Sequence, residues 1–276
     1  MRGDPRKLIT AGVREAASFV ARVGETMRSK YIWTHTEMEQ AIGYLIYVRE
    51  YLKHQKGKHV TFQEIFGTSG EFFEVKHFKR GFNSKSITFK TIVNDEVRKW
   101  VLKIGHRISP VVDFGDPSTE AYSKEYEERL NMLREKISTI PALAFLLPEP
   151  QEVVWAVLRE EGEQTATTLV VQPFVHVIKT RMAKKKLSEK QRKTLLKEFE
   201  AFKKLTGDLA QAHNLQPDLL GEGNLEIMEK DGAYHLVLLD SGFVNLDAPL
   251  PITHAVMHFA GQQTLANTEN LIRKIL

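Results

Sequence analysis

A chain of 276 residues can form one large domain or two modest ones, and its 42% hydrophobic and 27% charged residues are typical of a globular protein. There is no cysteine, which excludes disulfides and thiolate metal sites and favours a reducing compartment. No stretch has the length needed to span a bilayer, and the first ten residues lack the apolar core of a signal peptide. We therefore expect a cytoplasmic protein with no membrane partner.

The net charge of +4 is unevenly distributed. Between Lys179 and Lys204 there are eleven Lys or Arg residues and three Glu residues, a cluster that would attract phosphate-bearing partners. The same segment has its large apolar residues at helical spacing, which favours a solvated helix face with outward lysines. Nucleic acid binding is the less favoured alternative.

The first sixty residues have helical periodicity. Apolar residues recur at helical spacing between residues 8 and 27. A second helix is predicted to open at Thr36, with Glu39 completing a capping box, and Thr61 with Glu64 forms a similar pair before a single short turn. No catalytic set is evident here, so packing is the expected role and binding of a protein partner is a further hypothesis.

Strand periodicity follows. Residues 71–79, 85–93 and 97–105 are rich in aromatic and β-branched residues and are separated by short turn sequences, which predicts an antiparallel meander. In the third strand, Lys103 faces away from Trp100. Such a lysine either extends to the sheet edge or meets a buried anion.

A helix is predicted after these strands. Asp116 followed by Pro117 suits a helix start, as cap and first-turn residue. The predicted buried stripe consists of Tyr122, Tyr126, Leu130, Leu133 and Ile137. Glu125, Glu127 and Glu128 lie near its border.

Two more strands and a long helix come next. The strands are predicted at residues 152–160 and 165–174. Ser188 and Gln191 form a capping box for a helix that runs to about His213.

Three oxygen-bearing side chains then surround a predicted hairpin. The stretch PDLLGEGN contains Asp218 and Asn224, and LVLLDSGF contains Asp240. Acids and amides beside glycine are typical of turns, but the same groups could form a metal site. His254 and His258 have the spacing of a zinc pair, yet no glutamate follows the first and no third ligand is evident, so we interpret them as packing or surface residues.

The order of these features resembles the protein-kinase-like fold. Five strands with one helix between the third and fourth, a lysine in VLK, a long helix, an Asp and Asn hairpin and an Asp-x-Gly are similar to the compact bacterial branch with aminoglycoside and choline-type phosphotransferases, over roughly residues 70 to 245. The resemblance implies an α+β bilobal fold. An N-terminal helical extension (residues 1–68) would precede an N-lobe with a five-stranded antiparallel sheet and one helix (69–173) and a small, mostly helical C-lobe (174–276).

The resemblance also implies roles for the polar residues. Lys103 would hold the α- and β-phosphates of ATP and pair with Glu127, or with Glu125 as the reserve. Asp240 and Asn224 would bind Mg²⁺, which prefers hard oxygen donors. Asp218 lies where the family has its catalytic base.

Backbone groups would complete the nucleotide site. Those of Gly81, Asn83 and Ser84 would cover the phosphates, and those near Gln172 and Phe174 would meet the adenine edge. The expected function is transfer of the γ-phosphoryl group of Mg-ATP to a hydroxyl of a small molecule or protein.

Two departures from the family pattern motivate an alternative. Gln216 stands where the family usually has histidine, and five residues rather than four separate Asp218 from Asn224. The alternative is a catalytically weak or inactive pseudokinase that acts as a nucleotide-responsive interaction module.

Overall fold

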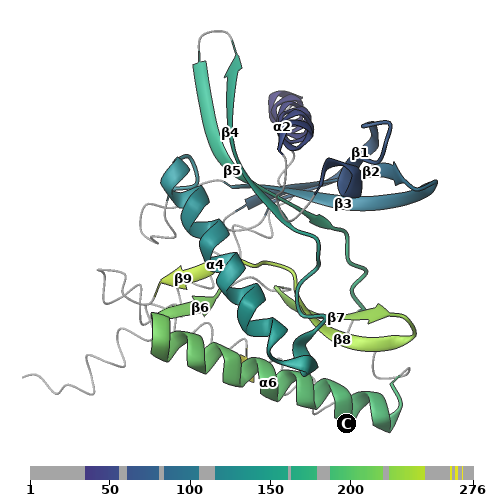
Figure 1. Ribbon diagram of the computed structural model, residues 1–276, viewed down its shortest axis with the longest axis vertical. Coiled ribbons are helices and arrows are strands. Elements are labelled where there is room, and N and C mark those ends of the chain that lie inside the picture. Colours follow the sequence, from purple (N-terminus) through teal and green to yellow (C-terminus); the bar gives the residue numbers. More distant parts are fainter. Residues whose placement is uncertain are drawn as a thin grey trace, which may run out of the picture.

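The computed structural model describes residues 35–55, 61–80, 84–105, 116–160, 163–178, 187–219 and 224–245, together with 262, 265, 266 and 269. A five-stranded sheet with its covering helices forms one part of the molecule, and a long helix with two small β-ladders forms the other (Figure 1). The predicted stripe at 8–27, the loop residues Gly81 and Asn83, and the pair His254 and His258 lie outside the described residues.

The sheet is antiparallel throughout, with the strand order β1-β2-β3-β5-β4. Its strands are β1 (Phe72–Arg80), β2 (Ser84–Val93), β3 (Glu96–Gly105), β4 (Glu152–Glu160) and β5 (Glu163–Pro173). All five match the predicted strands closely, because their β-branched and aromatic residues suit a pleated surface with at least one buried face. The predicted α+β class with a five-stranded antiparallel sheet is confirmed.

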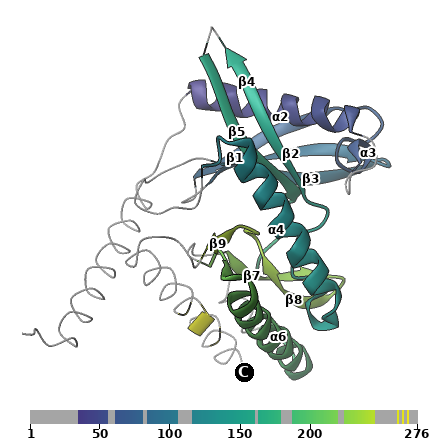
Figure 2. The ribbon, with the colours of Figure 1, turned by 60° about the vertical axis from the view of Figure 1, so that its left-hand side comes forward.

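Helices α2 (His35–His54) and α3 (Phe62–Phe66) cover one face of this sheet (Figure 2). The stretch predicted as an N-terminal extension thus shares one hydrophobic core with the strands. The capping box of Thr61 and Glu64 is confirmed. The predicted start at Thr36 is wrong, since α2 already includes that residue and its upstream neighbour.

One polar chain runs through this core. The indole N–H of Trp100 donates to Thr91 Oγ1 at 2.8 Å, and that hydroxyl donates to the Ile65 carbonyl at 2.5 Å. Trp100 and Thr91 are both buried, so the chain satisfies groups that would otherwise be costly to bury. It also ties α3 to the sheet.

Helix α4 (Glu120–Ser138) extends from the sheet toward the second part (Figure 1). Its N-cap is Thr119, whose hydroxyl accepts from the Tyr122 amide, so the predicted cap at Asp116 is wrong. Asp116 instead accepts hydrogen bonds from the amide and hydroxyl of Ser118. The short 3-10 helix η1 (Pro141–Leu143) follows.

Helix α6 (Glu189–His213) is the base of the second part. Its predicted capping box at Ser188 and Gln191 and its end at His213 are confirmed. Its large apolar residues are buried on one side of the helix, so that its lysines lie on the side toward solvent. The buried residues are Leu195, Phe199, Phe202, Leu205 and Leu209.

Two small antiparallel ladders lie between α6 and the sheet. Strand β6 (Leu215–Pro217) pairs with β9 (Phe243–Asn245), and β7 (Leu225–Lys230) pairs with β8 (Ala233–Leu238). They place the loop ends that carry the predicted acids beside the sheet. In the part of the chain that the structure describes, no helix is long and apolar enough to cross a membrane.

Candidate functional site

A small pocket lies where the five-stranded sheet meets the β6–β9 ladder. Its open space is about 40 Å³, enough for only a few water-sized groups. Its described lining comprises Ser84, Lys103, Gly105, Tyr122, Tyr126, Thr168, Val170, Asp218, Asp240, Gly242 and Phe243. Sheet, helix α4 and ladder therefore all contribute to one site.

Lys103 crosses from the sheet to the turn after β8. Its Nζ donates to the Leu239 carbonyl at 2.5 Å and lies 3.6 Å from Asp240 Oδ1. Gln172 Nε2 donates to the same carbonyl at 3.2 Å. The side chains of Lys103 and Asp240 are 12% and 24% exposed, so this ion pair is weakly screened by solvent. The predicted meeting of the β3 lysine with Asp240 is present in the structure.

The β7–β8 hairpin brings Asn224 to the same place. Its carbonyl accepts from the Leu239 amide at 2.7 Å, and its side-chain Nδ2 donates to the Asp218 carbonyl at 2.9 Å. The Asp218 amide donates to the Gly242 carbonyl at 2.7 Å, and Asp218 is buried. Asp218, Asn224 and the Asp240 turn are thus joined by two backbone hydrogen bonds and one from the Asn224 side chain.

The donor chemistry of Asp240 and Asn224 is of the kind that Mg²⁺ prefers. Asp240 offers carboxylate oxygens, and the Asn224 amide keeps its Oδ1 as an acceptor atom. Asp218 adds a second carboxylate to the pocket lining. Mg²⁺ is usually held by one or two protein oxygens with water and phosphate completing the octahedron. Among the described residues no three His, Cys, Asp or Glu side chains cluster for a metal, so an all-protein cage is not what these residues offer.

The predicted glutamate partner of Lys103 is absent from the described ion pairs. Glu125 pairs with Arg129 on the outer face of α4. No ion pair joins Glu127 to Lys103 among the described residues, where Lys103 faces Asp240. The turn of α4 that faces the pocket carries Tyr122 and Tyr126, because the predicted stripe itself, not its border, points at the site. Sequence reasoning assigned both tyrosines to packing.

Burial and nearby carboxylates favour the neutral form of both tyrosines. Desolvation raises the pKa of Tyr126 well above its ordinary value, and the nearby Asp240 carboxylate raises it further. The pKa of Tyr122 is raised by the same two causes, with a smaller contribution from Asp218. Both hydroxyls therefore remain hydrogen-bond donors throughout the physiological range.

The predicted nucleotide-binding backbone groups differ in outcome. Ser84 lines the pocket. Phe174 does not offer its amide to a ligand, because that N–H donates to the Lys99 carbonyl at 2.9 Å and extends the ladder past β5. Gln172 lies within β5, opposite Val101, and contributes its side chain to the site.

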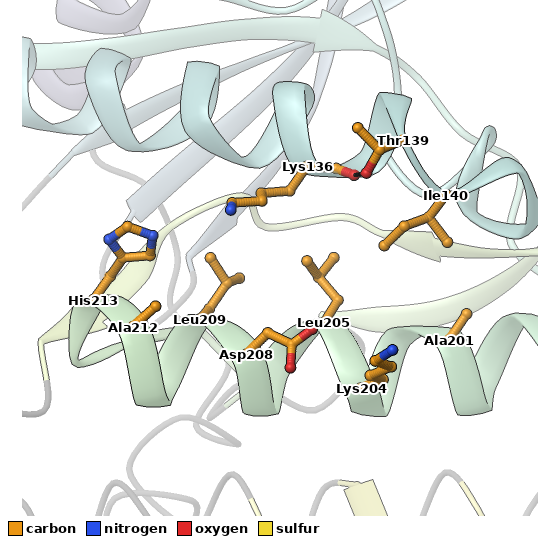
Figure 3. A pocket seen from close by; sticks show the side chains of 10 residues that line it. All are labelled: Lys136, Thr139, Ile140, Ala201, Lys204, Leu205, Asp208, Leu209, Ala212 and His213. Atoms are coloured by element: carbon orange, nitrogen blue, oxygen red, sulfur yellow. Dashed lines mark hydrogen bonds between the residues drawn. The ribbon is translucent and has the colours of Figure 1, made fainter.

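A larger hollow lies elsewhere, between the end of α4 and α6 (Figure 3). Its volume is about 540 Å³, and its walls combine Ile140, Leu205 and Leu209 with Lys136 and His213. It contains none of the residues predicted to act on a nucleotide. Volume alone therefore does not identify the candidate site.

Neither a family model nor a curated protein matches this chain.

Proposed function

We propose that this chain is a kinase-like phosphotransferase that moves the γ-phosphoryl group of Mg-ATP to a hydroxyl acceptor on a small molecule or a protein. The chain order supports this proposal: five antiparallel strands with one helix between the third and fourth, then a long helix and two ladders. The bilobal kinase-like architecture, with a cleft between lobes, is part of the proposal.

One observation carries most of the weight. A cation from β3 and a carboxylate from the turn after β8 lie 3.6 Å apart, although 137 positions separate Lys103 from Asp240 in the chain. The buried Asp218 lines the same pocket. A lysine, two acids and an amide gathered beside backbone donors form a set suited to polyphosphate and metal.

Each residue has a distinct task in this mechanism. Lys103 would release the Leu239 carbonyl and neutralise phosphate oxygens, which lowers the cost of charge build-up during transfer. Asp218 would accept a hydrogen bond from the acceptor hydroxyl and orient it in line with the γ-phosphate. Asp240 and Asn224 would hold Mg²⁺, which when bound draws charge from the phosphate oxygens.

Removal of the Asp240 carboxylate tests the proposal. We expect Asp240→Ala to abolish Mg-ATP turnover and to leave the circular dichroism spectrum and thermal midpoint near those of the wild type. Asp208→Ala is the matched control, since Asp208 is exposed on α6 and lines the other hollow. Turnover that is equal in Asp240→Ala and the wild type would refute the assignment.

A second function is favoured by one feature. Lys103 and Gln172 both donate to the Leu239 carbonyl, and the space beside them is far below the several hundred Å³ that a nucleotide fills. A molecule that keeps these bonds would be a pseudokinase that binds a partner. Thermal-shift titrations with ATP, with and without Mg²⁺, and an ATP-depletion assay separate the two functions: stabilisation without turnover supports the pseudokinase.

A further inference from the structure

A half-buried tyrosine of the pocket wall and two buried polar side chains form a hydrogen-bond chain. The Tyr126 hydroxyl lies 3.0 Å from Ser241 Oγ, and Ser241 Oγ donates to Gln151 Oε1 at 2.9 Å. Ser241 and Gln151 are each 1% exposed. The chain joins helix α4, the turn after β8 and the residue that precedes β4.

Proton counting fixes the direction of this chain. Ser241 has a single hydroxyl proton, and Gln151 Oε1 can only accept, so that proton goes to Gln151. Ser241 Oγ must then accept from Tyr126, whose hydroxyl is protonated for the reasons given above. Loss of the Tyr126 hydroxyl would remove the only donor that the described residues supply to Ser241 Oγ.

Ser241 is placed so that its position decides that of Asp240. It stands between Asp240 and Gly242, and Asp240 Oδ1 accepts from the Gly242 amide at 3.2 Å. A Cβ on Gly242 would lie 3.4 Å from Asp240 Oδ1 and 3.8 Å from the Tyr126 ring. The turn therefore lies beside α4 at van der Waals distance. Because Ser241 directly follows Asp240 in the chain, a displaced Ser241 moves the carboxylate with it.

Helix α4 is itself fixed to the sheet at its start. Thr168 Oγ1 on β5 donates to the Pro117 carbonyl at 3.0 Å, and Trp155 Nε1 on β4 donates to the Ser118 carbonyl at 3.4 Å. About two helical turns further on, Tyr126 makes the contact that crosses to the Asp240 turn. The helix thus transmits the position of the sheet to the candidate metal ligand.

We infer that Tyr126 is a positioning residue that sets the position of the Asp240 carboxylate through Ser241. In the chain it lies between Glu125 and Glu127, the two residues predicted to pair with Lys103. The inference rests on the proposed function for its consequence, which is the affinity for Mg²⁺ with nucleotide. Its structural half, the hold on the turn, can be measured without any ligand.

Hydrogen exchange of the ligand-free protein tests the hold on the turn. We expect Tyr126→Phe and Ser241→Ala each to speed amide exchange in a peptide that covers residues 238–245 by about fivefold, the loss expected for one net hydrogen bond. Tyr47→Phe is the control, because Tyr47 stacks on Tyr51 in α2 on the far face of the sheet. Unchanged exchange in that peptide, or an equal rise across the whole chain, would overturn the inference.

Calorimetry with Mg²⁺ and a non-hydrolysable ATP analogue tests the consequence. Tyr126→Phe should raise the Mg²⁺ concentration at half-saturation by about fivefold, and the double variant with Ser241→Ala should be no worse than the single variants, because both act on one chain. Multiplied effects, or an unchanged half-saturation, would contradict the positioning role. A wild type that binds no Mg-nucleotide would refute the proposed function, while the exchange result would still decide the hold on the turn.

Discussion

The two faces of strand β3 have opposite chemistry. One face points Trp100, Leu102 and Ile104 into the core beneath α2, and all three are buried. The other face carries Lys103 and Gly105, which line the pocket and are half-buried. Alternation along a strand puts successive side chains on opposite faces, so one strand of ten residues supplies both stability and a binding group. Substitutions at neighbouring positions of β3 should therefore affect either the stability of the fold or the binding of a ligand in the pocket.

The largest effect is expected on the core face. Trp100→Ala should lower the free energy of unfolding by about 3–5 kcal/mol, because it leaves a large cavity under α2. Urea denaturation measures this loss. Val97→Ala, on the same strand but 59% exposed, should change it by less than about 0.5 kcal/mol. Equal losses of unfolding free energy in Trp100→Ala and Val97→Ala would contradict the assignment of Trp100 to a core face.

A smaller loss should follow from cutting the polar chain in that core. Thr91→Val keeps the shape but removes the hydroxyl that accepts from Trp100 and donates to the Ile65 carbonyl. Two buried groups are left without partners, at an expected cost of about 1–3 kcal/mol. Chemical denaturation gives the value, with Thr194→Val on the exposed face of α6 as the control. A loss no larger than that of the control would contradict the prediction.

The pocket face should show the reverse pattern. Lys103→Met should lower the free energy of unfolding by less than Trp100→Ala does, because the Leu239 carbonyl keeps the hydrogen bond from Gln172 Nε2 and the Asp240 side chain is 24% exposed. The same variant should lose the thermal stabilisation by Mg-ATP. Lys99→Met is the matched control, four residues earlier on the same face, with its ammonium 3.6 Å from the centre of the Phe174 ring. A retained Mg-ATP response in Lys103→Met would contradict the assignment of the pocket face.

The smallest effect concerns a carboxylate outside the pocket. Burial raises the pKa of Glu226 on β7 above its ordinary value of 4.5. A raised pKa in the folded state means that stability from the protonated form is present below pH 4.5 and is lost as the pH rises through the folded-state pKa. Glu226→Gln should match the wild type at low pH and be slightly more stable at pH 7. Denaturation curves at both pH values check this, and a difference independent of pH would contradict it.

Local sequence signals predicted the elements well. Strand periodicity located all five strands, and the capping boxes at Thr61 and Ser188 marked true helix starts. The Thr36 and Asp116 signals failed because a capping pattern does not reveal which of several nearby polar residues adopts the cap conformation. At Asp116, a side-chain hydrogen bond to Ser118 stabilises a preceding turn, and Thr119 caps the helix.

The candidate site was predictable only in part. Lys103 and Asp240 carry a strand and a turn signature, and the structure brings them together. Tyr122 and Tyr126, which line the pocket, were missed. An aromatic residue at helical spacing is interpreted as a core residue, whether or not its hydroxyl reaches a pocket. A signal was present: a buried tyrosine hydroxyl usually needs a partner, and two of them one turn apart on a buried stripe indicate a polar neighbour. The Phe174 N–H is used by the sheet because strand pairing continues one residue past β5, while the prediction for the other backbone groups near Gln172 and Phe174 stays a prediction.

The carbonyl of Leu239 receives two hydrogen bonds from the sheet, one from Lys103 and one from Gln172. This acceptor is a main-chain oxygen, so it is still present when the side chain at position 239 is replaced. These two hydrogen bonds can be removed from the donor side, by substitution of Lys103 on β3 or of Gln172 on β5. Substitutions at Leu239 should therefore keep both hydrogen bonds, whereas a substitution at Lys103 or at Gln172 should remove one of them.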